Sequence, residues 1–491
     1  MHGEPTLGTK GETMTKRLWI VFGITVLLAG LVSAQEAKTI LQNAAKAMGD
    51  VQSIQFSGTG HNDAVGQAFT PGGPWPETNV TSYTKTVDYS SRSSKEELTR
   101  VEPPNLRGGG APFGGAQKQV NLVSGQYAWN QPGNAPQPAV AAAEERQLQI
   151  WLTPLGFVKA ANENNATAKK GKGGTVISFT AMGKFKVEGT INPQGLVTET
   201  KTWMANPVLG DMLVETTYSG YKDFNGVKFP AMIVQKQGGQ TVMDLAVTSV
   251  QANAPLSLTV PDSVKQAKLP AVQVESQKLA DGVWWIGGGT HHSVVIEYPA
   301  YITVIEGPLS EERSLAVIAE AKKLVPNKPI KYLVNTHQHF DHSGGIRTYV
   351  AEGATIITNA INRPYYEQTF KAPRTLAPDR LSQNPKRATF ITVKDKYTLA
   401  DGGREIDIYH VDNDNHNQGI LMVYLPKEKI LVEADDFTPP APNGPPPAPR
   451  AVAFTKNLEV NIERLKLDVE TIAPLHGFVV PVAELKKVAG A

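Results

Sequence analysis

The spacing of apolar residues divides the chain into three regions. Residues 18–31 form an unbroken apolar run, LWIVFGITVLLAGL, which directly follows Lys16 and Arg17. Residues 51–250 alternate apolar and polar positions with a period of two, which predicts β-strands. From about residue 270 onward, short apolar runs alternate with stretches of helical periodicity, and this pattern predicts a layered α/β arrangement.

The first region is typical of a secretory signal peptide. The basic pair precedes the apolar run, and Val32-Ser33-Ala34 supplies the small residues of a cleavage site. Residues 1–34 are therefore predicted to be removed, with Gln35 as the new N-terminus. An uncleaved anchor is the alternative, but the run is short for a membrane span. We expect a periplasmic or secreted protein without a membrane span in its mature form, and a start at either Met1 or Met14.

Residues 36–260 predict a helix followed by one long antiparallel sheet. The apolar residues of 36–48 fall on one helical face, and Gly49 ends the helix. Turn signals such as Asn225-Gly226 and Gly238-Gly239 separate the strands that follow. Neighbouring strands are therefore predicted to form hairpins in one curved sheet.

Four segments interrupt the strand pattern. Residues 140–151 predict a helical insert. The Gly- and Pro-rich segments 66–76 and 107–115 predict mobile surface loops. Residues 255–270 predict a linker to the region that follows.

The leading helix, the long sheet and the phrase YSGYKDFNGVKFP at residues 218–230 resemble the outer-membrane lipoprotein-sorting (lipoprotein carrier) family. The resemblance covers residues 36–260 and implies a β half-barrel whose concave face can hold an apolar ligand or chain. The alternative is a β-rich domain that only packs against the region after it. The sequence leaves both interpretations open.

The segment THQHFDHSGG at 336–345 follows the short apolar strand predicted at 332–334. It contains three of the ten histidines of the chain and one carboxylate. Residues two apart in an extended segment point to the same side, so His337 and His339 can bind one ion. Asp341 and His342 come after the chain turns, and they can face a second ion.

Three downstream residues also lie where a predicted apolar strand meets a polar loop: His416, Asp435 and His476. Asp436 competes with Asp435 for the same role. A two-metal centre needs more ligands than the first segment supplies, and these positions can provide them.

Other residues near these motifs were weighed for the same site. His410 lies within a predicted strand and is interpreted as structural. His291-His292 follow a glycine turn, where they could either touch substrate or be solvated as an exposed pair. The proline-rich segment 438–450, TPPAPNGPPPAPR, predicts a stiff loop at the lip of the site.

These motifs, in this order, resemble the metallo-β-lactamase-fold hydrolase superfamily over residues 270–491. The resemblance implies an αββα sandwich with two metal ions at one edge. The ligands that it implies are His337, His339 and His416 for the first metal, Asp341, His342 and His476 for the second, and Asp435 as a bridge. Imidazole and carboxylate ligands predict two Zn²⁺ ions, with iron or manganese as alternatives.

The predicted fold class is therefore α+β with two domains, a β half-barrel with a helix at 36–260 and an αββα sandwich at 270–491. The predicted reaction is hydrolysis of an ester, thioester, lactone or related bond of a small molecule by a metal-bound hydroxide, which the catalytic Asp341 orients. A net charge of +2 gives no sign of a nucleic-acid partner.

Two alternative functions remain at this stage. The chain has no cysteine, which excludes lactamases with a cysteine metal ligand, and Asp435 favours the other hydrolases. β-Lactam hydrolysis nevertheless stays an alternative. The other is an exported binding or carrier protein with a degenerate hydrolase domain, which the seven filled ligand positions disfavour.

Overall fold

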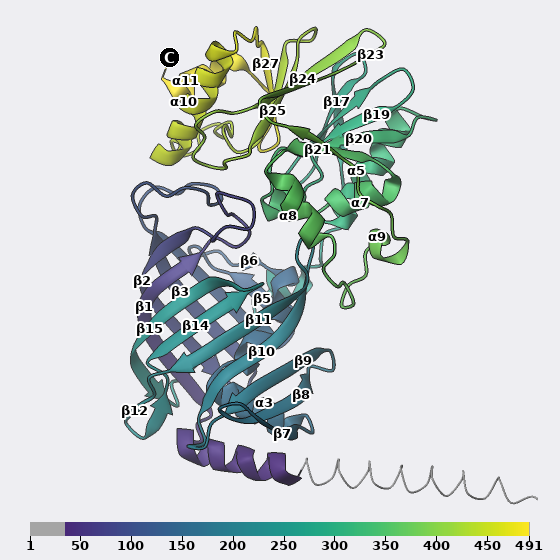
Figure 1. The fold of residues 1–491 in the computed structure, drawn as a ribbon. Helices are drawn as coiled ribbons and strands as arrows, with labels where there is room; N and C mark the ends of the chain where they lie inside the picture. Colours follow the sequence, from purple (N-terminus) through teal and green to yellow (C-terminus); the bar gives the residue numbers. More distant parts are fainter. Residues whose placement is uncertain (1–34, 491) are drawn as a thin grey trace, which may run out of the picture.

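The computed structural model describes residues 35–490. The predicted signal peptide lies outside these residues. A 13-stranded sheet lies within residues 53–252, and two smaller sheets lie within residues 275–481 (Figure 1). Among the described helices, none has both the length and the apolar character needed to cross a bilayer.

Every pair of neighbouring strands in the large sheet is antiparallel. The strand that comes first along the chain pairs with the strand that comes last. The order of the sheet is β6-β5-β4-β3-β2-β1-β15-β14-β11-β10-β9-β8-β7, so β6 and β7 are its edges. The strands are β1 (Ser53–Asp63), β2 (Glu77–Asp88), β3 (Ser93–Val101), β4 (Gln117–Ser124), β5 (Tyr127–Asn130), β6 (Gln137–Pro138), β7 (Thr167–Gly171), β8 (Gly174–Ala181), β9 (Phe185–Ile191), β10 (Val197–Asn206), β11 (Gly210–Ser219), β14 (Met232–Gln237) and β15 (Gln240–Ala252). β12 (Lys222–Phe224) and β13 (Val227–Phe229) pair separately.

Helices cover one face of this sheet, and the core lies between the helices and the strands. Residues 35–48 are helical, and Leu41, Ala44 and Met48 are buried in the core, as their spacing predicts. The predicted insert is present as η1 (Val140–Ala142) and α2 (Ala143–Trp151).

A further helix, α3 (Pro154–Glu163), was not predicted. Thr153 caps it by accepting a hydrogen bond from the Gly156 amide at 3.2 Å.

The likeness of this region to the lipoprotein carriers remains a prediction.

The predicted linker is packed against the large sheet. It contains the short helix α4 (Asp262–Gln266), and Val264 is buried against Val120, Leu122 and Trp129. Leu258 and Val260 of this segment pack against the same cluster, so apolar contacts hold the predicted linker on the sheet.

The second region contains two mixed sheets. The seven-stranded sheet has the order β16 (Glu275–Ala280), β17 (Val283–Gly287), β18 (Ser293–Glu297), β19 (Ile302–Ile305), β20 (Ile330–Val334), β21 (Thr355–Asn359) and β22 (Phe390–Val393). The six-stranded sheet has the order β23 (Lys396–Asp401), β24 (Arg404–His410), β25 (Leu421–Leu425), β26 (Ile430–Glu433), β27 (Thr471–Pro474) and β28 (Val480–Pro481).

The two sheets pack face to face, and helices cover their outer faces. One apolar core lies between the sheets, and a separate core lies on the outer side of each. The helices of the first outer core are α5 (Glu311–Leu324), α7 (Ile346–Glu352), α8 (Asn362–Thr369) and α9 (Arg380–Gln383), and those of the second are α10 (Pro449–Arg464) and α11 (Val482–Ala489). The predicted αββα arrangement of this region is confirmed.

The two regions meet at one end of the large sheet (Figure 1). Arg374, in the segment between α8 and α9, is 8% exposed and donates hydrogen bonds to the carbonyls of Asn206, Pro207 and Val208 at 3.0, 2.9 and 2.8 Å. These carbonyls belong to the hairpin between β10 and β11, so one buried guanidinium holds that hairpin against the second region.

We expect Arg374→Ala to lower the free energy of unfolding by about 2–3 kcal/mol, because three carbonyls, one of them buried, lose a charged donor. Denaturant unfolding followed by tryptophan fluorescence would measure the change. Arg387→Ala, at an exposed position, is the matched control. Equal unfolding midpoints for the two variants would contradict this account of the contact.

Candidate metal centre

The predicted ligand segment lies directly after β20, a strand of the seven-stranded sheet. His337 and His339 are in the extended stretch after the strand. Asp341 and His342 are in α6 (Phe340–Ser343), the single turn of helix that follows. The strand end fixes the first pair, and the helical turn directs the second pair to the neighbouring position.

His337, His339 and His416 form the first cluster. One ring nitrogen of each lies within 4.8 Å of the others, and all three side chains are buried. The Nε2 of His337, the Nδ1 of His339 and both nitrogens of His416 have no hydrogen-bond partner. Buried polar atoms without partners are rare in folded proteins, so three of them facing one point fit a bound cation.

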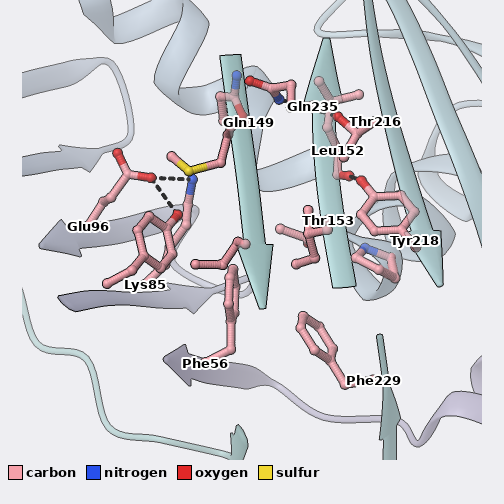
Figure 2. Close-up of a pocket in the computed structure, with 15 residues that line it drawn as sticks. Phe56, Lys85, Glu96, Gln149, Leu152, Thr153, Thr216, Tyr218, Phe229 and Gln235 are labelled. Carbon is pink, nitrogen blue, oxygen red and sulfur yellow. Dashed lines mark hydrogen bonds and ion pairs between the residues drawn. The ribbon is translucent and has the colours of Figure 1, made fainter. Parts of the chain in front are cut away.

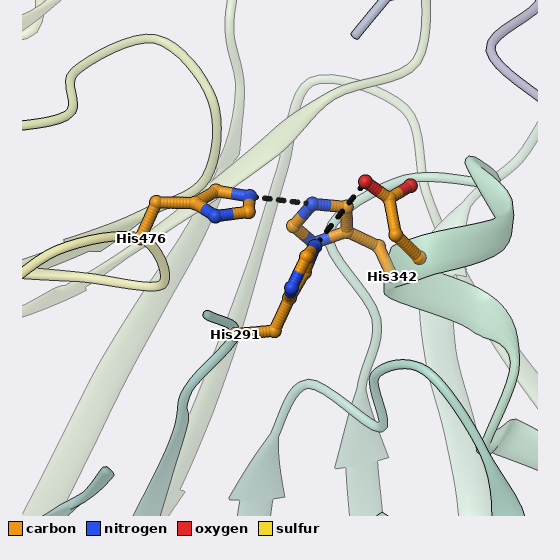
Figure 3. Close-up of side chains that lie close together, drawn as sticks. His291, His342 and His476 are labelled. Carbon is orange, nitrogen blue, oxygen red and sulfur yellow. Dashed lines mark hydrogen bonds and ion pairs between the residues drawn. The ribbon is translucent and has the colours of Figure 1, made fainter. Parts of the chain in front are cut away.

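The second cluster contains Asp341, His342, His476 and His291, again with one ligand atom each within 4.8 Å of the others. Figure 3 shows the three imidazoles converging with the carboxylate beside them. The Nε2 atoms of His342 and His476 are 3.0 Å apart, and the Nε2 of His291 is 3.2 Å from Asp341 Oδ2. A carboxylate and clustered imidazoles are also a suitable ligand set for a divalent metal.

Asp435 lies between the two clusters. Its Oδ2 is 2.8 Å from the Nε2 of His342 and 3.3 Å from that of His337, and its Oδ1 is 3.1 Å from the Nε2 of His476. Its Oδ2 is also 3.5 Å from the Nε2 of His416. The carboxylate therefore contacts imidazoles of both clusters, as a bridging ligand must.

Asp436 faces away from the imidazoles. Its side chain is buried near Asp414. Burial, together with Asp414, raises the pKa of Asp436 well above its usual value. Of the two neighbouring aspartates, the geometry places only Asp435 among the predicted ligands.

The charges of the site are set by burial and by these contacts. Burial opposes ionisation of Asp435, but His342, His476 and His416 outweigh it and hold its pKa well below the usual range. Burial lowers the pKa of His339 to about 3, with His416 adding to the effect. The pKa shifts thus favour the ionised form of Asp435 and the neutral form of His337 and His339, as metal ligation requires, whereas Asp435 and Asp341 overcome burial and raise the pKa of His342 well above its usual value.

Glu306 orients the imidazoles from behind, and the sequence analysis missed it. It is fully buried after β19, with its Oε2 3.2 Å from His342 Nδ1 and accepting a hydrogen bond from Thr336. The Thr336 hydroxyl is also 3.0 Å from His337 Nδ1, so one carboxylate controls two rings. An acidic residue directly after the predicted strand ITVI was the available signal.

Glu306 and Asp435 share a left-handed backbone conformation. Glu306 has φ +73° and Asp435 has φ +64°. Both are the acidic residues that follow buried strands, β19 and β26, and both reach the imidazoles from such turns.

The expected solvation of His291 and His292 is wrong. Both are buried, and the His291 carbonyl accepts a hydrogen bond from Arg313 at 2.9 Å. Arg313 is 3% exposed and also binds the carbonyls of Ile286 and Gly287, so it holds the turn between β17 and β18 over the site.

The two histidines differ in their placement, and His410 differs from both. His291 Nδ1 lies 2.8 Å from the Thr290 hydroxyl, and its ring belongs to the second cluster. His292 packs on Trp285 with ring centroids 4.2 Å apart. His410 lies outside both clusters and contacts the carbonyl of Gln418.

The proline-rich segment is shorter than predicted. It ends at Ala448, because Pro449 starts α10 and Arg450 belongs to its first turn. Proline is favoured at a helix start, since it lacks only an amide hydrogen that has no partner there. Arg450 pairs with Glu102 of the first region at 2.6 Å, so the end of this segment contacts the large sheet rather than the metal centre.

The family model of the metallo-beta-lactamase superfamily matches residues 283–476. A curated relative, the linear primary-alkylsulfatase of a Pseudomonas species, is 24% identical over 173 residues. That match covers 29% of this chain and 32% of the relative, so the chain spans about a third of the length of that protein.

Among solved structures, a metallo-beta-lactamase from Pontibacter korlensis is 19% identical, with a TM-score of 0.34, covering 44% of this chain and 98% of that one. The metallo-beta-lactamase FIM-1 from Pseudomonas aeruginosa, in its mono-zinc form, is 17% identical, with a TM-score of 0.35, covering 45% and 96%.

The match to the family model defines a metallo-beta-lactamase superfamily domain at residues 283–476. All seven predicted ligands lie within this range, which begins at β17 and ends at His476.

Loss of a residue that supports a metal ligand typically weakens metal binding by about 10- to 100-fold. We expect Asp435→Asn to weaken metal binding by more than this, because the substitution removes a carboxylate that contacts both clusters. Asp436→Asn changes a carboxyl group that belongs to neither cluster, and this variant should bind metal as the unchanged protein does. Metal content after dialysis measures both. The opposite ranking would assign the bridging role to Asp436.

Proposed function

We propose that this chain is an exported hydrolase with two metal ions, zinc in the first instance, that cleaves an ester, thioester, lactone or related bond of a small molecule. The observation that carries the proposal is the pair of donor clusters joined by Asp435. A protein with a degenerate centre would be expected to lack some of these donors.

Seven side chains would hold the ions. They are His337, His339 and His416 in the first cluster, Asp341, His342 and His476 in the second, and Asp435 between them. Two such ions lower the pKa of water to about 7 and polarise the bond to be cleaved. The same donors suit iron or manganese, so zinc is the proposal and not the sole candidate.

Asp341 is the proposed catalytic residue. Its side chain is 29% exposed, whereas His337 and His342 beside it are almost fully buried. It is therefore the motif carboxylate that can reach both the metal centre and solvent. His291 Nε2 contacts its Oδ2, which fixes the orientation of the carboxylate at the mouth of the site.

The choice among bond types rests on weaker support. The relative named above is an alkylsulfatase, and this favours including sulfate esters among the candidate substrates. β-Lactam hydrolysis has less support, because Thr438-Pro439-Pro440 follows the Asp435 turn, where no lysine is available for a lactam carboxylate.

The large sheet contains a small pocket of about 80 Å³, and Phe56, Phe229 and Leu245 supply part of its apolar lining. Figure 2 shows Lys85 and Glu96 at one side of it, with the Lys85 amino group 3.4 Å from the carboxylate. The pocket thus combines an apolar lining with an ion pair, and a role of the first region in holding an apolar ligand stays a proposal.

Zinc-loaded protein is expected to turn over at least one member of a panel of nitrophenyl esters, thioesters, lactones and alkyl sulfates, and a chelator should abolish this activity. Asp341→Ala should lower kcat by about 10²- to 10⁴-fold. His410→Ala, outside both clusters, is the control. Selective hydrolysis of a cephalosporin would support the lactamase alternative, and metal binding without turnover would support the carrier alternative.

Export predicts that the mature chain begins at Gln35 and fractionates with the periplasm or medium. N-terminal sequencing of protein recovered from its host would measure this directly. Replacing Lys16 and Arg17 by Glu should retain the protein in the cytoplasm, because the basic n-region is lost. An intact N-terminus on cytoplasmic protein would refute the proposal.

A further inference from the structure

The loop between β1 and β2 of the large sheet lies against the ligand segment of the hydrolase domain. The Phe340 amide donates to the Gly66 carbonyl at 3.3 Å, and Phe340 packs edge-on to Trp75 with ring centroids 5.9 Å apart. Trp75 and Ala68 are buried in the same apolar cluster, to which Phe340 contributes. The central aromatic residue of the ligand segment is therefore packed inside the first region.

Two residues of this loop contact the predicted metal ligands directly. The Gln67 side-chain amide donates to Asp341 Oδ1 at 2.8 Å. The Ala68 carbonyl lies 3.0 Å from His339 Nε2 and accepts a second hydrogen bond from Gln338 at 2.8 Å. The Asn417 side-chain nitrogen lies 3.2 Å from the same atom, but the contact with Ala68 is shorter, and a carbonyl can only accept, so the proton of the neutral His339 ring is assigned to Nε2. This leaves Nδ1, the unpartnered nitrogen, free to bind an ion.

Further contacts hold the loop on the other side of the site. The Gln418 amide donates to the Phe69 carbonyl at 3.0 Å, and the Gly108 amide donates to the Asn415 carbonyl at 2.8 Å. Gln418 and Asn415 flank His416, so the segment 66–76 contacts both histidine loops, and the segment 107–115 contacts the His416 loop. Several backbone groups of these segments are thus hydrogen-bonded to the second region, and the predicted mobility of the two segments stays a prediction.

From these contacts we propose that the β1–β2 loop is a working part of the metal centre, with Gln67 and the Ala68 carbonyl as positioning groups. The first region thus has a role in the hydrolase site whatever its own pocket binds. Gln67 holds one oxygen of Asp341 so that the other faces the second cluster, and Ala68 sets the tautomer of His339. This inference rests on the proposed function, because it assigns these groups to the predicted metal ligands.

Gly66 offers a way to move the loop without altering any ligand. It has φ +75°, and a Cβ there would lie 2.3 Å from the Phe340 ring, so Gly66→Ala must push the loop off the ligand segment. Gly183→Ala is the matched control, because Gly183 has φ +67° in the same region and a Cβ there meets nothing within 4 Å. Gln67→Ala removes only the amide that contacts Asp341.

The experiment titrates the metal-free full chain with Zn²⁺ and with Co²⁺ against a chromophoric chelator. We expect Gly66→Ala and Gln67→Ala to weaken binding of at least one ion by about 10- to 100-fold, with a changed visible spectrum of the Co²⁺ form. Gly183→Ala should bind as the unchanged chain does. Thermal unfolding of the metal-free Gln67→Ala protein should match that of the unchanged chain, which separates positioning from a loss of folding.

The outcomes distinguish this inference from the proposed function. If the unchanged chain binds two ions and both Gly66→Ala and Gln67→Ala bind them equally well, the loop only packs on the site and the inference is wrong. If the unchanged chain binds no metal, the proposed function and the inference fail together. If Gly66→Ala alone unfolds, Gln67→Ala still decides, because it leaves the backbone of the loop unchanged.

Discussion

The structure around the metal centre depends on keeping certain buried nitrogens unpaired. Each ligand imidazole must turn one nitrogen toward the ion, while its other nitrogen needs a partner that fixes the ring. Glu306 and Thr336 do this for His342 and His337, and the Ala68 carbonyl does it for His339. These partners come from different parts of the chain, so the sandwich, its turns and the adjacent sheet must all be in place before the donors converge.

Much of the site could be predicted, because its ligands follow buried strands. The apolar strands β20, β26 and β27 read clearly from the sequence, and Asp435 and His476 come just after two of them. Hydrophobic periodicity also located most strands of the large sheet. It missed α3 and α4, because these helices are short and are stabilised by tertiary packing that local patterns do not encode.

The residues that were missed share a different cause. Gln67 is 274 positions from Asp341, and Glu306 is 36 positions from His342, so no local spacing connects them. Glycine and proline content suggested mobility for the loop that carries Gln67, although backbone groups of this loop are hydrogen-bonded to the second region. Amino-acid composition indicates which conformations a loop backbone can adopt, whereas contacts with the neighbouring domain determine which of these conformations the loop has.

The left-handed backbone at Glu306 and Asp435 places a limit on how this site can change. Glycine is the residue best suited to such φ values, and holding a carboxylate there costs on the order of 1–3 kcal/mol per residue. Replacement by glycine would relieve that strain and remove the charge at the same time. Selection for stability and selection for metal binding therefore oppose each other at these two positions, and a relative that has lost its metals would be expected to drift toward glycine or asparagine there.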